Sequence, residues 1–444
     1  MAIGLLAVAA LAFLGVCALA WSGSLGLKAM ILLAVAAGTY FVGRQKLPTA
    51  KRKGPDGVAK IGFTLAGCMA LLRHPIEVEG QGKLPVYDAI LAYIDQVDSS
   101  TFITFALVAM AVKFVGVISS AFGWHLLLVG QGVRYPFWQK VMTSFLIGRF
   151  IGTFLPSTIG LDGYTLYEAG KYSNQWARVI TAKTLEKFVG ITGLFLGMLV
   201  TLPFGYSVIV DVTTKAGAPE RAPLLAGLIA AIAGSICLTV VVGLVWPTFI
   251  QLIMGVVERV GGLVLVGPLH KIQGKVLGVL GQFKASVGSY RGKVGLLMAV
   301  LAAKFVTHFT TAVVYYFTAL AIGVSTAEFW PITFGSTIQI LATLFSPTIA
   351  GEGAREAFQS ILLSNQLGGV AQAVLSGALG FLAAEAATLW GGAFMWVRKP
   401  GWRPNFAEVD GKQVDYAWIN DAEDTGFDAD KIAAARAAHA ADRR

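Results

Sequence analysis

Apolar runs of about 20 residues, the length that a helix needs to cross a bilayer, recur along most of this 444-residue sequence. Hydrophobic residues make up 56% of the chain and charged residues only 14%, whereas soluble domains carry about 25% charged residues. Hydrocarbon cannot satisfy open sheet edges, and the sequence lacks the alternating ten-residue segments of a membrane barrel. The sequence therefore predicts an all-α polytopic membrane protein.

The net charge of +10 does not indicate nucleic-acid binding. The basic residues cluster in loops between apolar runs, where the positive-inside rule places them in a membrane protein. Cys17, Cys68 and Cys237 all fall in apolar runs and show neither disulfide nor metal-ligand spacing. We therefore expect no nucleic-acid partner, no metal and no cofactor.

Composition divides the chain into three parts. Residues 1–100 predict an N-terminal hairpin, a short span and an external surface helix. Residues 101–397 predict a membrane-embedded core, within which the basic, glycine-rich residues 246–293 form a cytoplasmic amphipathic segment. Residues 398–444 predict a cytoplasmic tail, mostly disordered with a helical end. Loop charges place both termini in the cytoplasm of a multi-pass protein of the inner cell membrane.

Two apolar segments are broken by similar sequences. LPSTIGLDGYT at residues 155–165 aligns without a gap with FSPTIAGEGAR at residues 345–355, so that Asp162 matches Glu352. Loop charges place the first break in a segment entered from the cytoplasm and the second in one entered from outside. Two such breaks predict inverted repeats with two re-entrant broken helices. The alternative is that each is a proline-kinked helix with incidental glycines.

The second break carries a recognisable motif, Pro…Gly-x-Gly-x-Arg-Glu, formed by Pro347, Gly351, Gly353, Arg355 and Glu356. With it, residues 100–397 resemble the transmembrane flippase region of lysylphosphatidylglycerol synthases and its stand-alone relatives. The first break matches the family's Pro…Gly-Gly-Asp…Arg pattern in part, because Leu161 replaces a glycine and Thr165 stands where arginine is frequent. Glu186-Lys187 resembles the family's Glu-Arg pair.

The resemblance implies translocation of lipids between leaflets. We do not expect the aminoacyl-transferring soluble domain of fused members here, because the tail is too short to hold one. We therefore expect a transporter and not an enzyme, with membrane lipids as partners. A homo-oligomer and a separate lipid-modifying enzyme are further partners that the sequence leaves open.

Ionisable residues inside apolar segments are costly, so they mark functional sites by default. The candidate substrate-binding residues are Arg149, Asp162, Glu186, Lys187, Lys304, Glu352, Arg355 and Glu356, and the candidates for proton coupling are His308 and Glu385. Arg149 and Arg355 are favoured for a head-group phosphate, because a guanidinium group binds two oxygens at once. Each candidate also has a structural interpretation, as a snorkelling or paired charge.

The favoured function is translocation of a phospholipid or polyprenyl-phosphate lipid with an anionic or aminoacylated head group. One alternative is a secondary transporter of a soluble organic anion. Another is an intramembrane carboxylate-dependent hydrolase in which Asp162 and Glu352 converge. The sequence contains no His-Glu-x-x-His, Gly-x-Ser-x-Gly or P-loop motif, which disfavours common hydrolases and nucleotide-driven enzymes.

Overall fold

The computed structural model describes residues 2–22, 27–48, 52–78, 82–154, 159–264, 268–344, 346, 348, 351–397, 406–409 and 412–415. Seven helical segments within these ranges are long and apolar enough to cross a membrane, namely Gly4–Trp21, Pro55–Arg73, Ser99–Gly130, Trp176–Thr201, Pro219–Val245, Val294–Ala321 and Val370–Met395. The protein is therefore an all-α, multi-pass membrane protein, as the sequence predicts.

The chain forms two compact units, each built from three stretches of sequence. Unit 1 comprises Met1–Lys113, Val200–Leu228 and Thr311–Ala384. Unit 2 comprises Phe114–Leu199, Ile229–Thr310 and Glu385–Arg444. Two long helices, α5 (Ser99–Gly130) and α13 (Val294–Ala321), contribute residues to both units. The two units do not coincide with the three parts of the sequence, because each unit contains residues from the part at 101–397.

Unit 1 begins with three helices, α1 (Ala2–Trp21), α2 (Leu27–Gln45) and α3 (Lys53–Arg73). Helices α1 and α3 pack around Phe13 and Phe63, whose ring centroids lie 4.7 Å apart. Near the end of α2, the Arg44 guanidinium donates two hydrogen bonds to the carboxylate of Asp56 in the first turn of α3, at 2.7 and 3.1 Å. This ion pair links the end of α2 to the start of α3.

A β-hairpin that the sequence analysis did not anticipate follows α3. Strands β1 (Pro75–Val78) and β2 (Gly82–Pro85) pair antiparallel and lead into α4 (Val86–Ile94). Helix α4 lies within the predicted surface helix and is held to unit 1 by the Tyr93 hydroxyl, which donates to the Ile322 carbonyl. Helix α5 then starts after Asp98, where a hydrogen bond from the Thr101 backbone N–H lowers the pKa of the Asp98 carboxyl.

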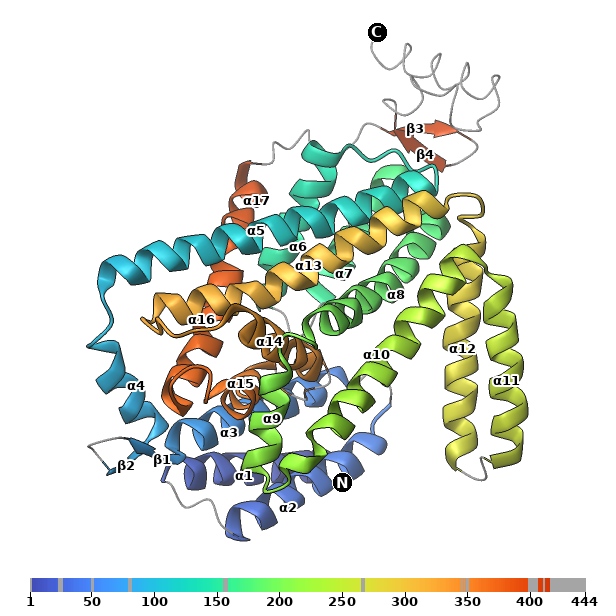
Figure 1. Ribbon diagram of the computed structural model, residues 1–444. Helices are drawn as coiled ribbons and strands as arrows, with labels where there is room; N and C mark the ends of the chain where they lie inside the picture. Colours follow the sequence, from blue (N-terminus) through green and yellow to red (C-terminus); the bar gives the residue numbers. More distant parts are fainter. Residues whose placement is uncertain are drawn as a thin grey trace. The chain divides into compact units, whose positions relative to one another are not determined.

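The remainder of unit 1 contains the second broken segment. Its elements are α9 (Tyr206–Lys215), η3 (Pro219–Arg221), α14 (Phe329–Leu344), α15 (Ala354–Leu363) and most of α16 (Val370–Leu389). Helices α14 and α15 form an antiparallel hairpin (Figure 1). A Cβ atom at Gly351 would lie 2.8 Å from Thr343, and one at Gly335 would lie 2.6 Å from Leu363. Small residues therefore allow the two arms to pack closely.

Unit 2 contains the first broken segment and the larger apolar core. Its elements are the end of α5, η2 (Phe137–Met142), α6 (Thr143–Phe154), α7 (Ile159–Ser173), α8 (Trp176–Thr201), α10 (Ala222–Val245), α11 (Thr248–Val264), α12 (Pro268–Gly288), the start of α13, η5 (Trp390–Gly392) and α17 (Ala393–Val397). Trp124, Phe145, Leu185 and Phe283 are fully buried in this core.

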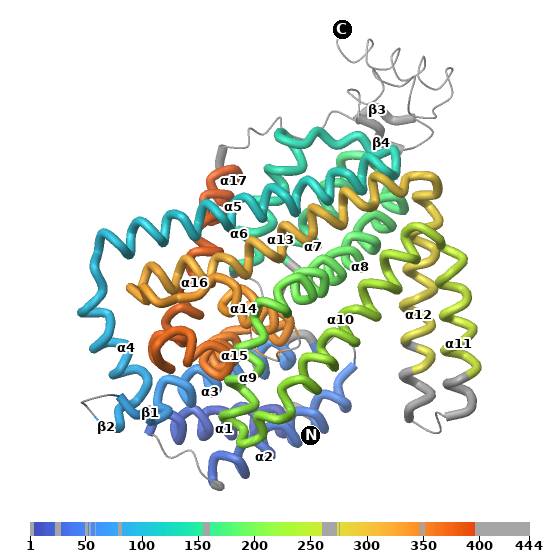
Figure 2. The backbone as a smooth tube through the Cα atoms, in the orientation of Figure 1, coloured from blue at the N-terminus to red at the C-terminus, as the bar shows by residue number. Residues whose placement is uncertain are grey.

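Helices α11 and α12 form a second hairpin within unit 2 (Figure 2). The Gln273 side chain of α12 donates to the Val257 and Glu258 carbonyls of α11. Ile250 and Phe283, at the base of this hairpin, are buried in the unit 2 core. The amphipathic segment predicted at 246–293 is thus a helical hairpin, and its position on the membrane surface stays a prediction.

The first break is shorter than the sequence analysis predicts. Helix α7 begins at Ile159, inside the similar sequence at residues 155–165, and Gly160 in its first turn packs directly on Gly152 of α6. In the second break, α14 ends at Leu344 and α15 begins at Ala354.

The order of elements repeats along the chain. A long helix, a helical hairpin and another long helix occur as α5, α6–α7 and α8, and again as α13, α14–α15 and α16. This repeated order agrees with an internal repeat. The inverted membrane orientation of its two halves, and the re-entrant insertion of the hairpins, stay predictions.

The described part of the tail contains two strands, although the sequence analysis predicts disorder there. Strand β3 (Phe406–Val409) pairs antiparallel with β4 (Lys412–Asp415). The predicted helical end of the tail lies outside the described residues.

The contact between α6 and α7 yields a stability prediction. A Cβ atom at Gly160 would overlap the Gly152 backbone, so Gly160→Ala is expected to lower the free energy of unfolding by about 1–3 kcal/mol. Gly190→Ala in α8 is the matched control, because no atom lies within 4 Å of the new methyl group. The control is expected to be neutral or slightly stabilising. Equal melting temperatures for the two variants in detergent would contradict the close packing.

Candidate functional site

Helix α8 presents three charged side chains on one face. Glu186 and Lys187 follow Lys183 by three and four residues, so helical periodicity brings both close to Lys183. The first turn of α7, immediately after the first break, supplies Asp162. Helix α13 supplies Lys304. All five residues belong to unit 2, and we call them the charge network.

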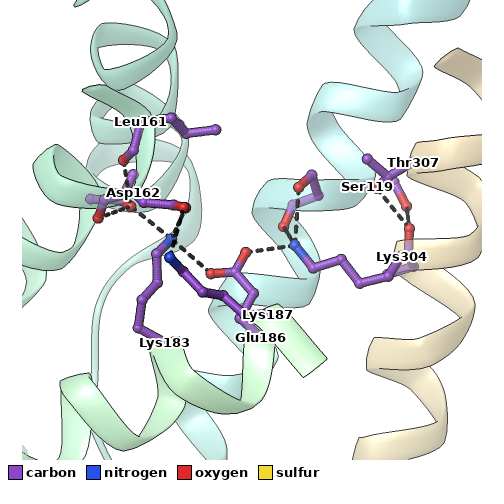
Figure 3. Close-up of polar contacts among 11 residues, drawn as sticks. Ser119, Leu161, Asp162, Lys183, Glu186, Lys187, Lys304 and Thr307 are labelled. Carbon is purple, nitrogen blue, oxygen red and sulfur yellow. Dashed lines mark hydrogen bonds and ion pairs between the residues drawn. The ribbon is translucent and has the colours of Figure 1, made fainter. Parts of the chain in front are cut away.

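The two carboxylates of the charge network lie between its lysines (Figure 3). Glu186 accepts from Lys183 at 2.7 Å with one oxygen and from Lys304 at 2.5 Å with the other. Asp162 contacts Lys183 Nζ at 3.0 Å and Lys187 Nζ at 3.4 Å. Each carboxylate thus bridges two cations, which is how charges inside a membrane segment are compensated.

Neutral groups complete the surroundings of the two buried lysines. Lys183 also donates to the Thr165 hydroxyl at 3.1 Å, and its Nζ lies 4.7 Å from the centroid of the Trp124 ring. Lys304 donates to the Ser120 hydroxyl at 3.1 Å. These contacts fix the buried ammonium groups in place.

The charge network carries one more positive charge than negative charge, with three lysines against two carboxylates. Lys183, Lys304 and Glu186 have side chains only 6%, 6% and 9% exposed. The Lys187 side chain, in contrast, is 61% exposed. The unbalanced positive charge is therefore at the accessible edge of a buried ionic cluster, where an anion has a partner available.

A second ionic group of unit 2 joins α6 to the end of α16. Arg149 Nη2 lies 3.3 Å from Glu385 Oε1, and Arg149 Nε donates to the Thr388 hydroxyl. The Thr153 hydroxyl donates to the other Glu385 oxygen at 2.5 Å. Packing of Gly391 directly on the Leu146 carbonyl permits this close approach.

A third ionic group occupies the start of α15 in unit 1. Arg355 donates to Glu356 Oε1 through Nε and Nη2, at 2.9 and 2.6 Å. The other Glu356 oxygen accepts from the Gly353 backbone N–H, closing the N-terminus of the helix. The Arg355 guanidinium also lies 4.1 Å from the Phe381 ring centroid. This arginine is thus neutralised by its own neighbour.

The structure brings together four of the predicted site residues, Asp162, Glu186, Lys187 and Lys304, and separately pairs Arg149 with Glu385. Glu352 is half-buried in the turn before α15, and His308 is half-buried on α13, one turn after Lys304. Arg149 and Arg355 fall in different units, and their role at a head-group phosphate stays a prediction. In the part of the chain that the structure describes, no group of three His, Cys, Asp or Glu residues is arranged to hold a metal ion.

Sequence reasoning missed the uncharged partners of these groups, which are Ser120, Trp124, Thr153, Thr388 and Phe381. Serine, threonine and aromatic residues are ordinary members of membrane helices. Nothing in the sequence distinguishes these from their neighbours, and only the folded arrangement does.

Comparison with known protein families identifies the same region of the chain. The sequence profile of the lysylphosphatidylglycerol synthase TM region matches residues 87–392. The chain belongs to this family. The lysylphosphatidylglycerol synthase TM region thus contains the charge network, the Arg149–Glu385 pair and the α6–α7 and α14–α15 hairpins, whereas α1, α2 and α3 precede it. No curated protein and no solved structure matches the chain significantly.

Proposed function

We propose that the protein translocates an anionic lipid, a phospholipid or a polyprenyl phosphate, between the leaflets of the inner cell membrane. The charge network carries this proposal, because it combines buried, compensated charges with one accessible surplus cation. Membership of the lysylphosphatidylglycerol synthase TM family supports a role in lipid chemistry at the membrane. The proposal assigns transport and not catalysis to this chain.

The balance of charge favours an anionic group as the ligand of the network. Asp162 and Glu186 compensate two of the three lysines, and among the described residues Lys187 forms an ion pair only with Asp162, at 3.4 Å. A lipid phosphate near Lys187 would restore neutrality to the cluster. Charged hydrogen bonds of this kind are stronger than neutral ones.

Asp162 can couple ligand binding to a rearrangement of the α6–α7 hairpin. It lies in the first turn of α7, directly after the first break, and contacts Lys183 and Lys187 of α8. A phosphate that competes with Asp162 for these lysines weakens the hold of α8 on the start of α7. Binding then favours a second arrangement of the α6–α7 hairpin, because the ligand has different affinities for the two arrangements.

The pairing of the carboxylates argues against hydrolysis by the charge network. General acid/base work by two carboxylates needs them to face each other, which separates their pKa values. Here each carboxylate is bound by two lysines. The repeated order of helices and hairpins instead agrees with a transporter that alternates between two states.

Reversing the surplus charge tests the proposal. In proteoliposomes with fluorescent phosphatidylglycerol, Lys187→Glu is expected to slow exposure of inner-leaflet lipid to an external quencher by roughly tenfold, equivalent to about 1.4 kcal/mol. The melting temperature should hardly change, because an exposed ion pair contributes about 0–1 kcal/mol. Lys171→Glu, at an exposed lysine in the last turn of α7, is the matched control and should transport normally. Equal rates for both variants would overturn the role of Lys187.

A further inference from the structure

Unit 1 contains a group of buried polar atoms that the charge network does not use. Ser336 and Gln339 on α14 and Gln359 on α15 are all fully buried. Among the described residues, none provides a hydrogen-bond partner for the Ser336 hydroxyl or for the amide oxygen and nitrogen of either glutamine. Buried polar groups in native proteins are almost always hydrogen-bonded, so five such atoms on one hairpin require a partner from elsewhere.

The two glutamines lie at the same level of the α14–α15 hairpin. Gly335 packs on Leu363, and Gln339 and Gln359 each lie one turn from that contact, toward the break. Because the arms run antiparallel, both side chains fall between the Gly335–Leu363 contact and the turn. Ser336 precedes Gln339 by three residues and shares its face of α14. The unpartnered atoms thus form one group.

The charged residues closest in sequence to Gln359 neutralise each other. Glu356 precedes Gln359 by three residues, and the Arg355 guanidinium compensates its charge. On the other side, Gly377 of α16 packs against the aliphatic part of Gln359, since a Cβ atom there would lie 3.4 Å from the Gln359 side chain. A neutral hydrogen-bonding ligand fits such surroundings better than a free charge does.

We propose that Ser336, Gln339 and Gln359 recognise the vicinal hydroxyl groups of a polyol head group, glycerol or a sugar, on the transported lipid. A carboxamide donates and accepts at adjacent positions, and a pair of hydroxyl groups does the same. A site built to bond hydroxyls rejects the analogue that lacks them, because its buried amides stay unpaired. The inference rests on the proposed lipid translocation and adds the chemistry that selects the lipid.

Head-group selectivity in detergent tests the inference with the full-length protein. We would measure the rise in melting temperature caused by dihexanoyl phosphatidylglycerol, by dihexanoyl phosphatidic acid, which lacks the diol, and by a short-chain glucosyl diacylglycerol. The wild type is expected to bind the diol-bearing phospholipid more tightly than phosphatidic acid. Gln339→Met and Gln359→Met should weaken binding of the diol-bearing lipid about tenfold and leave phosphatidic acid unchanged. A larger rise in melting temperature with the glucosyl lipid identifies a sugar as the ligand. A larger rise with phosphatidylglycerol identifies glycerol.

The melting temperature without lipid separates this role from a structural one. An amide without a partner stabilises nothing, so the two methionine variants should melt at the wild-type temperature or higher. Gln366→Met is the matched control, because Gln366 donates to Asp211 at 3.1 Å in the same unit. It should melt lower and keep the wild-type preference among lipids. A fall in melting temperature for Gln339→Met or Gln359→Met would show that the amides pair with each other and would overturn the inference.

The lipid arms also separate the inference from the proposed function. If the wild type binds both phospholipids alike and the methionine variants change nothing, recognition of hydroxyls is wrong and lipid translocation still stands. If the wild type binds none of the three lipids, both are wrong.

Discussion

Replacing Glu186 by alanine is expected to lower the free energy of unfolding by about 3–5 kcal/mol, because it leaves two buried lysines without their shared anion. Lys183 and Lys304 contact the two oxygens of this carboxylate at 2.7 and 2.5 Å, and both side chains are 6% exposed. Neither ammonium group reaches water without a change in structure. Denaturant unfolding in detergent micelles, followed by tryptophan fluorescence, measures the loss.

A double variant distinguishes the loss of charge compensation from the loss of packing. Lys304→Met in a Glu186→Gln background removes one unpaired ammonium group, while Asp162 still compensates Lys183 at 3.0 Å. The double variant should therefore be more stable than Glu186→Gln alone, giving a coupling of about 0.5–3 kcal/mol. Additive losses from the two substitutions would contradict the ion pairing shown in Figure 3.

Removing Arg149 is expected to have the second-largest effect. Arg149→Ala should lower the free energy of unfolding by about 1.5–3 kcal/mol, the contribution of a hydrogen bond to a charged group. It leaves Glu385, whose side chain is 17% exposed, with the Thr153 hydroxyl but without its cation. Arg149→Lys should recover only part of the loss, because one ammonium group cannot reproduce the separate contacts with Glu385 and Thr388.

An exposed arginine of the same unit provides the control for Arg149. Arg178 donates to Gln175 at 3.0 Å on the surface of the protein. Arg178→Ala should change the stability by less than about 0.5 kcal/mol. An equally small loss of stability for Arg149→Ala would show that the Arg149–Glu385 pair does not stabilise the fold.

The sequence predicts those parts of the fold that depend on local periodicity. The apolar runs predict membrane-crossing helices, and the spacing of Lys183, Glu186 and Lys187 places them on one face of α8. In the described part of the second break, Gly351 and Gly353 adopt φ of +77° and +76°, which glycine tolerates and other residues rarely do, so glycine at these positions agrees with an interruption between α14 and α15.

Long-range pairing is what the sequence does not predict. Arg149 and Glu385 are 236 residues apart, and Glu186 and Lys304 are 118 apart, so no local pattern links them. The same holds for the uncharged partners Trp124 and Ser120. Residues 159–165, expected in the first break, belong to α7, because the contact between Gly160 and Gly152 of α6 forms between two helices and has no local signal.

The measurement that tests the central claim most directly compares a lipid with a soluble anion in the same proteoliposomes. Fluorescent phosphatidylglycerol is placed in both leaflets, radiolabelled glycerol phosphate is added outside, and an external quencher reports inner-leaflet lipid as it reaches the outer leaflet. We predict that the wild type exposes the inner-leaflet lipid and accumulates no glycerol phosphate. Accumulation of glycerol phosphate, with inner-leaflet lipid as protected as in protein-free liposomes, would contradict lipid translocation and identify a transporter of soluble organic anions.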